Sequence, residues 1–284
     1  MVSSALNKIE SQSPSVIVAV RNEQRMLPVT VPSVLNAAEQ IGAKVLWVCN
    51  ACTDDSAEII RGITGEHTSV LEIAEAGKTA AFNAGDEVIN GYFPRFYVDS
   101  DARLSSDTLI KLFEALATEQ CDLVAPRQVF QSSSASPRAQ RIAHCWMSLP
   151  FASTAAFSVV VGLSERGRNA WEHFPNIMGD DVFIAAKIPK DRKKMVLTAE
   201  VYVPTPDSFF DWVKTRRRWL DGEKQLRELG LPVSATVRQR NELLRQCLSL
   251  STAQAAIEFL LVRLLAGLYP SKGGRSDWIP LRSR

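Results

Sequence analysis

Short apolar runs alternate with amphipathic stretches through the first half of the chain, and this alternation limits the folds that the sequence can adopt. The apolar runs have the length of buried strands, and the stretches between them repeat apolar residues at helical spacing. Strands that are apolar throughout occur mainly in parallel sheets that helices cover on both faces. We therefore predict an α/β fold with a mostly parallel sheet and flanking helices. The expected strands are residues 16–20, 44–49, 69–74, 95–98 and 122–125, and the expected helices are residues 23–40, 54–62 and 78–89, with another after Asp107.

Composition excludes some partners and leaves others open. The chain has 284 residues, of which 46% are hydrophobic and 23% charged, so a substantial core is expected. A formal net charge of +2 is too small to indicate a nucleic-acid partner, and none is expected. The first residues lack a basic start followed by an apolar stretch, and we expect a cytoplasmic protein.

Polar residues follow the ends of the expected strands. Residues 21–23, 50–55, 76–78 and 99–101 are such segments. Ligands of parallel sheets bind beyond the carboxyl ends of the strands, so these loops should converge on one edge. Amide and carboxylate groups there suit a base and a ribose, and Lys78 suits a phosphate. We predict a nucleotide site at this edge.

Asp99-Ser100-Asp101 ends one of the apolar strands. Two carboxylates at this spacing turn toward one crevice if the backbone bends there, and hard-oxygen pairs hold Mg²⁺ or Mn²⁺ beside phosphates. The alternative is a solvated turn. The position of the Asp99-Ser100-Asp101 motif at the predicted nucleotide edge favours a metal site.

Two further groups of charged residues lie in the second half. Asp180-Asp181 precedes an apolar helical turn; the pair either stabilises a helix start or supplies a general base, because repulsion and burial raise a carboxyl pKa. A long helix over residues 209–229 carries consecutive arginines at 216–218, which point in different directions. At least one should face inward, where it would neutralise charge on a leaving diphosphate.

Cys49-Asn50-Ala51-Cys52 has the spacing of a thioredoxin-like redox pair between a strand and a helix. The chain is much longer than a thioredoxin domain, and the predicted nucleotide site offers a rival explanation for the same loop. An odd total of five cysteines suits reduced thiols better than a disulfide framework.

Three less regular segments complete the chain. We interpret residues 127–138 as a mobile polar loop over the site, and the uncharged stretch 142–164 as a helix followed by a buried strand at 157–161 rather than a membrane span. Residues 243–269 are rich in leucine and alanine but contain charges, so a spanning helix is not expected. This helix should pack on the domain, on a second subunit or in a membrane interface.

Taken in chain order, these motifs resemble family 2 glycosyltransferases. The matching stretches are residues 18–23, residues 48–56, Gly77-Lys78 with Asn83-Ala84-Gly85, Asp99-Ser100-Asp101, Asp180-Asp181 and Arg218-Trp219. The resemblance implies a GT-A (Rossmann-like) fold with a C-terminal helical extension, and inverting, metal-dependent transfer from a nucleoside-diphosphate sugar to a glycan or lipid-linked acceptor.

The resemblance also implies roles for individual residues. Asp181, Asp180 and Arg218 would be catalytic, with Asp181 as the general base, and Asp101 and Asp99 would hold Mn²⁺ or Mg²⁺. The expected nucleotide-sugar ligands are Val20, Asn22, Glu23, Asn50, Lys78, Asp99, Ser100, Arg218 and Trp219.

Two positions depart from the family pattern. Asn50 replaces an aspartate that many members carry, and Thr215 stands at the Gln/Arg position of the last motif, where Arg216 and Arg217 lie close enough to substitute in part.

We expect residues 1–130 to form the nucleotide-sugar half, residues 131–230 the acceptor and catalytic half, and residues 231–284 a helical extension. A nucleotidyltransferase or a non-catalytic scaffold on a similar sheet are the alternatives. If the extension binds lipid, the protein would act on the inner face of the membrane, through residues 243–269.

Overall fold

A computed structural model describes residues 13–64, 68–118, 120–131, 134–155, 158–231 and 252–270, together with Asn241 and Arg245. Within this part of the chain the fold is built on an eight-stranded sheet in the order β3-β2-β1-β4-β7-β6-β8-β5. Its strands are β1 (Ser15–Val20), β2 (Lys44–Asn50), β3 (Ser69–Ile73), β4 (Arg95–Asp99), β5 (Arg103–Leu104), β6 (Leu123–Gln131), β7 (Val160–Leu163) and β8 (Lys193–Pro204).

The sheet is parallel in its first half and mixed in its second. Strands β3, β2, β1 and β4 run parallel, as the apolar runs predict. Strand β7 then runs antiparallel to both β4 and β6, whereas β6 and β8 are parallel and β5 closes the edge antiparallel to β8. The α/β prediction is confirmed, and the antiparallel strands are confined to the second half.

Helices cover both faces of the sheet, because alternate residues of each buried strand point to opposite sides. Val16 and Val18 of β1 join the core under the helices at 27–39, 56–64 and 108–118, whereas Ile17 joins the core under the helices at 78–88 and 180–187. The helices are α2 (Leu27–Glu39), α3 (Ser56–Thr64), α4 (Lys78–Val88), α5 (Thr108–Thr118), α6 (Pro137–Ser148), α7 (Glu165–Arg168), α8 (Asp180–Lys187), α9 (Phe209–Glu228) and α11 (Ala253–Leu268).

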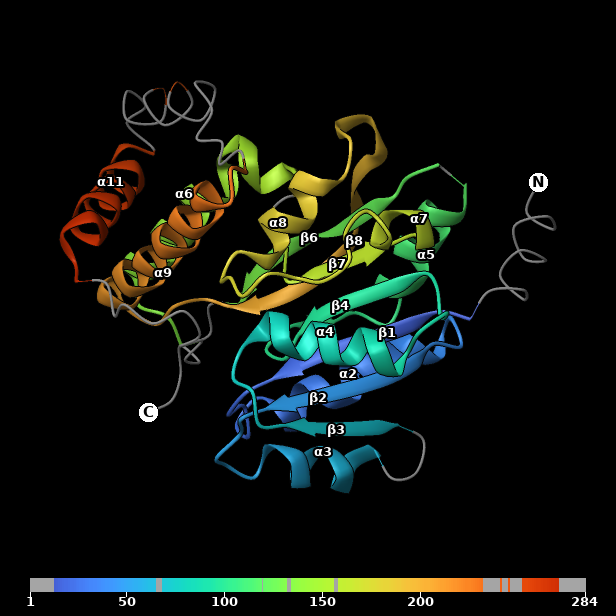
Figure 1. Cartoon of the computed structure of the whole chain (residues 1–284). Coiled ribbons are helices and arrows are strands. Elements are labelled where there is room, and N and C mark those ends of the chain that lie inside the picture. The colour runs from blue at the N-terminus through green and yellow to red at the C-terminus, as the bar shows by residue number, and fades with distance from the viewer. Residues whose placement is uncertain are drawn as a thin grey trace.

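Helices α6, α9 and α11 form a separate layer beyond one end of the sheet (Figure 1). Their shared core is rich in aromatic rings, and Trp146 and Trp212 are buried in it. Helix α11 contributes Phe259 and Val262 to this core, so it packs on the domain by one of its faces. The expected C-terminal helix is therefore present over 253–268; residues 243, 244 and 246–251 lie outside the described residues.

The expectation of a mobile loop over residues 127–138 is wrong. Strand β6 continues to Gln131 alongside β8, after a register shift between Pro126 and Arg127, and α6 begins at Pro137. The sequence pattern did not indicate this strand because both its exposed and its buried positions carry polar residues. Arg127 is exposed, whereas Gln128 next to it is buried.

The uncharged stretch 142–164 contains the end of α6 and strand β7, as expected; the strand begins at Val160, and residue 157 is outside the described residues. No helix in the described ranges has the length and hydropathy needed to cross a membrane. One sheet runs through residues 15–204, so the division of the chain at residue 130 stays a prediction.

Candidate active site

The loops that follow β1, β2 and β3 are tied together by two asparagines. The Asn50 amide nitrogen donates to the carbonyl of Val20 at 2.7 Å, and its oxygen accepts from the backbone N–H of Gly77 at 3.0 Å. Asn22, with φ of 54°, accepts from the backbone N–H of Thr53 at 2.8 Å. The predicted convergence of these loops is confirmed. The buried Asn50 amide uses two hydrogen bonds to connect the ends of β1 and β2 to the loop before α4.

Glu23 is the first acid at this edge. Its backbone N–H donates to the Ser56 hydroxyl at 2.9 Å, and its side chain is buried. Burial raises its pKa to about 8, and the negative charges of Asp101, Asp54 and Asp99 act in the same direction.

The backbone bends directly after β4, as the predicted metal motif requires. The Asp99 N–H donates to the Val159 carbonyl at 2.9 Å, and the Asp99 carbonyl accepts from Ala102 at 3.0 Å, which closes a turn. Ser100 within this turn is buried, and its hydroxyl has no hydrogen-bond partner among the described residues. A buried hydroxyl of this kind normally has a partner, so this turn has capacity for a polar ligand.

Lys78 joins the two acidic motifs. It is the first residue of α4, and its Nζ lies 2.6 Å from Asp99 Oδ1 and 2.8 Å from Asp180 Oδ2. Burial alone would lower its pKa, but the carboxylates of Asp180 and Asp99 outweigh burial and raise it. The two acidic motifs, 81 positions apart in sequence (180 − 99), therefore meet at one site.

Asp181 is held at the same place by backbone groups. The N–H of Ser158 donates to Oδ2 at 3.2 Å, and the N–H of Val182 donates to Oδ1 at 2.8 Å. Burial, followed by the charge of Asp180, raises the pKa of Asp181 to about 7. A carboxyl group that titrates near neutral pH can accept a proton under ordinary conditions.

Helix α9 passes close behind the start of α8. A Cβ on Gly222 would lie only 3.4 Å from the backbone nitrogen of Gly179, and the Gln225 side chain accepts from the Met178 N–H at 2.8 Å. This close approach positions Asp180 and Asp181 at the first turn of α8.

Arg218 of α9 interacts electrostatically with the acids of the site. Burial lowers its pKa, whereas Asp101, Asp99, Glu23 and Asp180 act to raise it, so its guanidinium lies within electrostatic reach of the cluster.

The neighbouring arginines do not share the position of Arg218. Arg216 pairs with Glu223 at 2.8 Å and Arg217 pairs with Asp221, both on the same helix. Successive helical residues point about 100° apart, which separates the three side chains. The expectation that Arg216 and Arg217 substitute for the missing motif residue therefore has no support in these contacts. Trp219 likewise packs in the helical core, 5.5 Å from the ring of Trp146.

The charges of the cluster fit a divalent cation. The carboxylates of Glu23, Asp99, Asp101, Asp180 and Asp181 lie close enough to Lys78, to Arg218 or to one another to shift a pKa. Burial raises the pKa of Asp99 to about 7 against the opposing charge of Lys78. No three side chains of the described residues form a metal site by themselves. Asp99 and Asp101 would therefore share a metal with ligand phosphate oxygens, which is the usual way in which Mg²⁺ is bound.

Comparison with known proteins identifies the family of the chain. The family model described as Glycosyl transferase family 2 matches residues 15–166, more than half of the chain. The chain belongs to glycosyl transferase family 2. It is therefore a glycosyltransferase, and its expected resemblance is confirmed. No curated protein sequence matches the chain significantly.

Several solved glycosyltransferases share the fold of this enzyme at low sequence identity. A mannosyltransferase from Pyrobaculum calidifontis in complex with GDP-Man and Mn²⁺ is 17% identical with a TM-score of 0.58, covering 91% of this chain and 76% of that one. S. aureus TarS 1–349 in complex with UDP-GlcNAc is 13% identical with a TM-score of 0.55, covering 89% and 73%. The glucosyl-3-phosphoglycerate synthase of M. tuberculosis is 14% identical with a TM-score of 0.55, covering 82% and 86%.

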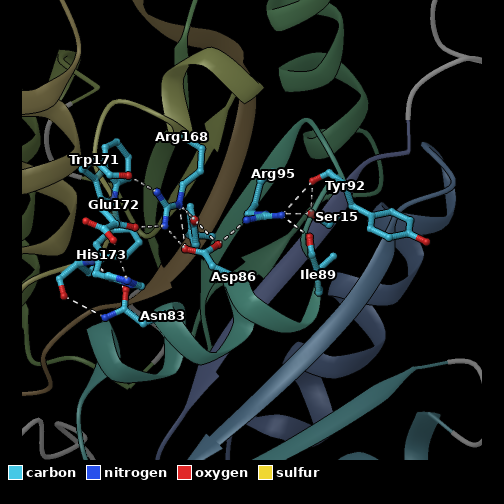
Figure 2. A network of polar contacts seen from close by, with 12 residues as sticks. Ser15, Asn83, Asp86, Ile89, Tyr92, Arg95, Arg168, Trp171, Glu172 and His173 are labelled. Atoms are coloured by element: carbon cyan, nitrogen blue, oxygen red, sulfur yellow. Dashed lines mark hydrogen bonds and ion pairs between the residues drawn. The ribbon is translucent and has the colours of Figure 1, made fainter.

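A second charged cluster of this glycosyltransferase lies at the opposite edge of the sheet, and sequence reasoning missed it (Figure 2). Asp86 near the end of α4 accepts from Arg95 at 2.7 Å through one oxygen and from Arg168 at 2.9 Å through the other. Arg168 also donates to the backbone carbonyls of Trp171 and Glu172, at 2.7 and 3.0 Å. The available signal was Arg95 itself, a charged and buried residue at the start of a strand whose next three residues are hydrophobic.

The Asn83-Ala84-Gly85 motif has a structural role beside this cluster. Asn83 exchanges two hydrogen bonds with the backbone of Phe174, at 3.0 and 2.8 Å. A Cβ on Gly85 would lie 2.7 Å from Ile17, so glycine lets α4 pack directly on β1. The motif thus fixes the loop that leads into Asp180.

Proposed function

We propose that this glycosyltransferase moves a sugar from a nucleoside-diphosphate sugar to a hydroxyl group of a glycan or lipid-linked acceptor, with inversion at the anomeric carbon. One observation carries the proposal: Lys78 links Asp99 to Asp180, which puts the predicted metal motif and the predicted base beside each other. A single displacement needs both at one sugar carbon, because the base and the leaving group act at the same time.

The donor would lie across the carboxyl ends of β1, β2 and β4. Asn22, Glu23 and Asn50, with the Val20 carbonyl, line the edge where the nucleoside would bind. Asp99 and Asp101 would hold Mn²⁺ or Mg²⁺, with Ser100 between them. When bound, the cation would neutralise charge on the departing diphosphate. Arg218 would stabilise the same charge, and donor phosphate would compete with Asp99 and Asp180 for Lys78.

Asp181 would take the proton from the acceptor hydroxyl. The two backbone N–H groups that it accepts from fix its orientation, and its neighbour Asp180 is held by Lys78. Positioned general bases of this kind contribute roughly 10² to 10⁴ in rate.

The decisive experiment compares Asp181→Asn with the wild-type enzyme. Release of nucleoside diphosphate from sugar donors in the presence of Mn²⁺ and acceptor should fall by about 10² to 10⁴ in the variant, while the donor Kd stays near normal. The wild-type rate should rise with pH through about 7 as Asp181 loses its proton, and the variant should lack this rise.

Comparable turnover in Asp181→Asn would remove Asp181 from the role of base. Release of sugar phosphate in place of nucleoside diphosphate from the same donors would indicate nucleotidyl transfer, and no turnover with any donor that binds would indicate a non-catalytic scaffold.

We also propose that helix α11 contacts a membrane surface from which a lipid-linked acceptor is taken. Seven of the thirteen exposed large hydrophobic side chains in the described part of the chain lie between residues 257 and 269. Glu258 on this helix is buried and paired with Arg141, so the exposed residues of α11 include a basic side chain, Arg263, and no acid. Apolar side chains with basic residues favour the interface of an anionic bilayer. The apolar residues are Ile257, Leu260, Leu261, Leu264, Leu265, Leu268 and Tyr269.

Flotation with anionic vesicles tests this contact. Leu264, which is 62% exposed, is replaced by serine, and the matched control is Leu197→Ser on β8, which is 60% exposed. We expect the wild type and the control to float and Leu264→Ser to float less. Equal flotation of all three proteins would refute the membrane contact, and a concentration-dependent dimer without flotation would assign the same face to a second copy of the chain.

A further inference from the structure

Two thiols at the end of β2 have no role in the proposed transfer. Cys49 is buried in the strand, whereas Cys52 is half buried in the loop that follows. Ala51 between them has φ of 46°, a left-handed conformation that is uncommon for a residue with a Cβ. This turn brings the chain back, so that Cys52 packs against the core cluster that contains Cys49. The Cys52 thiol donates to the carbonyl of Val20, the residue that pairs with Cys49 between β1 and β2.

The two thiols differ in the properties that govern disulfide exchange. A hydrogen bond from Cys49 lowers the pKa of Cys52 to about 7, against the opposing effect of burial, and a backbone hydrogen bond from Asn22 adds to the lowering. The same hydrogen bond raises the pKa of Cys49, and burial adds to this. The thiolate is the reactive form, so Cys52 is suited to attack and the adjacent Cys49 to resolve.

We propose that Cys49 and Cys52 are a reversible dithiol/disulfide site that exchanges with low-molecular-weight disulfides such as oxidised glutathione. The Cys52 thiolate attacks one sulfur of the glutathione disulfide, the S–S bond breaks, and one glutathione leaves as thiolate. The Cys49 thiol then loses its proton to solvent and attacks the Cys52 sulfur of the mixed disulfide, which releases the second glutathione. The protein gives up two electrons and two protons, and one glutathione disulfide becomes two glutathione thiols.

The disulfide would change the conformation of the proposed donor site, because Asn50 lies between the two cysteines. Asn50 joins the Val20 carbonyl to the Gly77 N–H, and the Cys52 thiol itself donates to the Val20 carbonyl at 3.5 Å. A disulfide holds its sulfur atoms about 2.05 Å apart, much closer than hydrogen-bonded thiols. Oxidation therefore removes the Cys52–Val20 hydrogen bond and displaces the Asn50–Thr53 loop. This consequence rests on the proposed function, whereas disulfide formation does not.

Mass spectrometry of the full-length protein tests the site itself. The protein is equilibrated in glutathione buffers of increasing oxidised fraction, quenched in acid, alkylated in denaturant and digested. We expect the peptide with Cys49 and Cys52 to lose both alkylated thiols in one two-electron transition that dithiothreitol reverses. Cys49→Ser should instead accumulate a glutathione adduct on Cys52, and Cys145→Ser, which removes a buried thiol elsewhere, should behave as the wild type.

A wild-type protein that keeps both thiols alkylatable, or that stops at the glutathione adduct, would overturn the proposal. Donor affinity is a second readout: we expect the donor Kd to rise about tenfold on oxidation, the effect of losing roughly one hydrogen bond, and to remain constant in Cys52→Ser. If the disulfide forms without any change in donor Kd, the proposed effect of oxidation on donor binding is wrong, whereas the proposed disulfide site itself is supported. Absence of donor binding by the reduced protein would count against the proposed function alone.

Discussion

The two edges of the sheet both contain buried acids and bases, yet they differ in charge balance. At the carboxyl ends of the parallel strands, acids outnumber bases, and the pKa values of Glu23, Asp99 and Asp181 are all raised. At the opposite edge, Asp86 is shared by Arg95 and Arg168, whose guanidinium groups also donate to backbone carbonyls (Figure 2).

This difference separates a reactive site from a structural one. Excess carboxylate at one edge is electrostatically unfavourable until a cation and a ligand arrive, which is typical of functional sites. The Asp86 cluster is satisfied within the protein and fixes residues 168–172 to α4. A cavity of about 450 Å³ adjoins this cluster, but its arginine side chains are already engaged by protein groups.

The strongest test of the structural edge is Asp86→Asn. The substitution keeps the shape of the side chain but leaves two buried arginines without a counter-charge, which should lower the free energy of unfolding by about 3–5 kcal/mol. Urea denaturation measures the change. Asp107→Asn, which removes an exposed ion pair with Lys111, is the control and should cost less than about 1 kcal/mol. Equal losses in the two variants would contradict a structural role for Asp86.

The strongest test of the catalytic edge beyond Asp181 is Arg218→Met. Removing a buried positive charge from the leaving-group side should lower kcat by roughly 10² to 10³ in the folded variant. Arg217→Met is the matched control on the same helix, because Arg217 pairs with Asp221, and its kcat should stay near that of the wild type. Similar kcat values in the two variants would show that α9 does not act on the leaving group.

A third test concerns Glu23 and the pH dependence of stability. Its pKa is raised from 4.5 to about 8, so protonation of Glu23 stabilises the fold fully below pH 4.5, and this contribution is lost as pH rises to about 8. In metal-free protein, the stability of Glu23→Gln should therefore fall less than that of the wild type between these pH values. Urea denaturation at several pH values with a chelator measures this, and parallel curves would contradict the raised pKa.

The two edges also differ in how far the sequence alone predicts them. The meeting of Asp99 and Lys78 could be predicted because each follows a strand of the parallel half, and parallel strands bring such positions together. The place of Asp181 came from the family resemblance. The Asp86 cluster could not, because Arg168 meets Asp86 only after β7 inserts antiparallel beside β4, a pairing that no local pattern specifies. The sequence pattern also did not predict strand β8. Its exposed Leu197 and buried Ala199 disturb the apolar pattern that is expected of a strand inside a sheet.

Helix α4 spans the distance between the two edges. It begins with Lys78 among the acids of the candidate active site and carries Asp86 at the far cluster, about 12 Å away along its axis at 1.5 Å per residue. Closely packed interiors transmit displacement, so a change in the contacts of Lys78 would shift α4 and, through Asp86, the loop that Arg168 holds. Binding and release of the donor should thus displace residues 168–174, which pack on the same face of the sheet as α4 but toward the opposite ends of the strands.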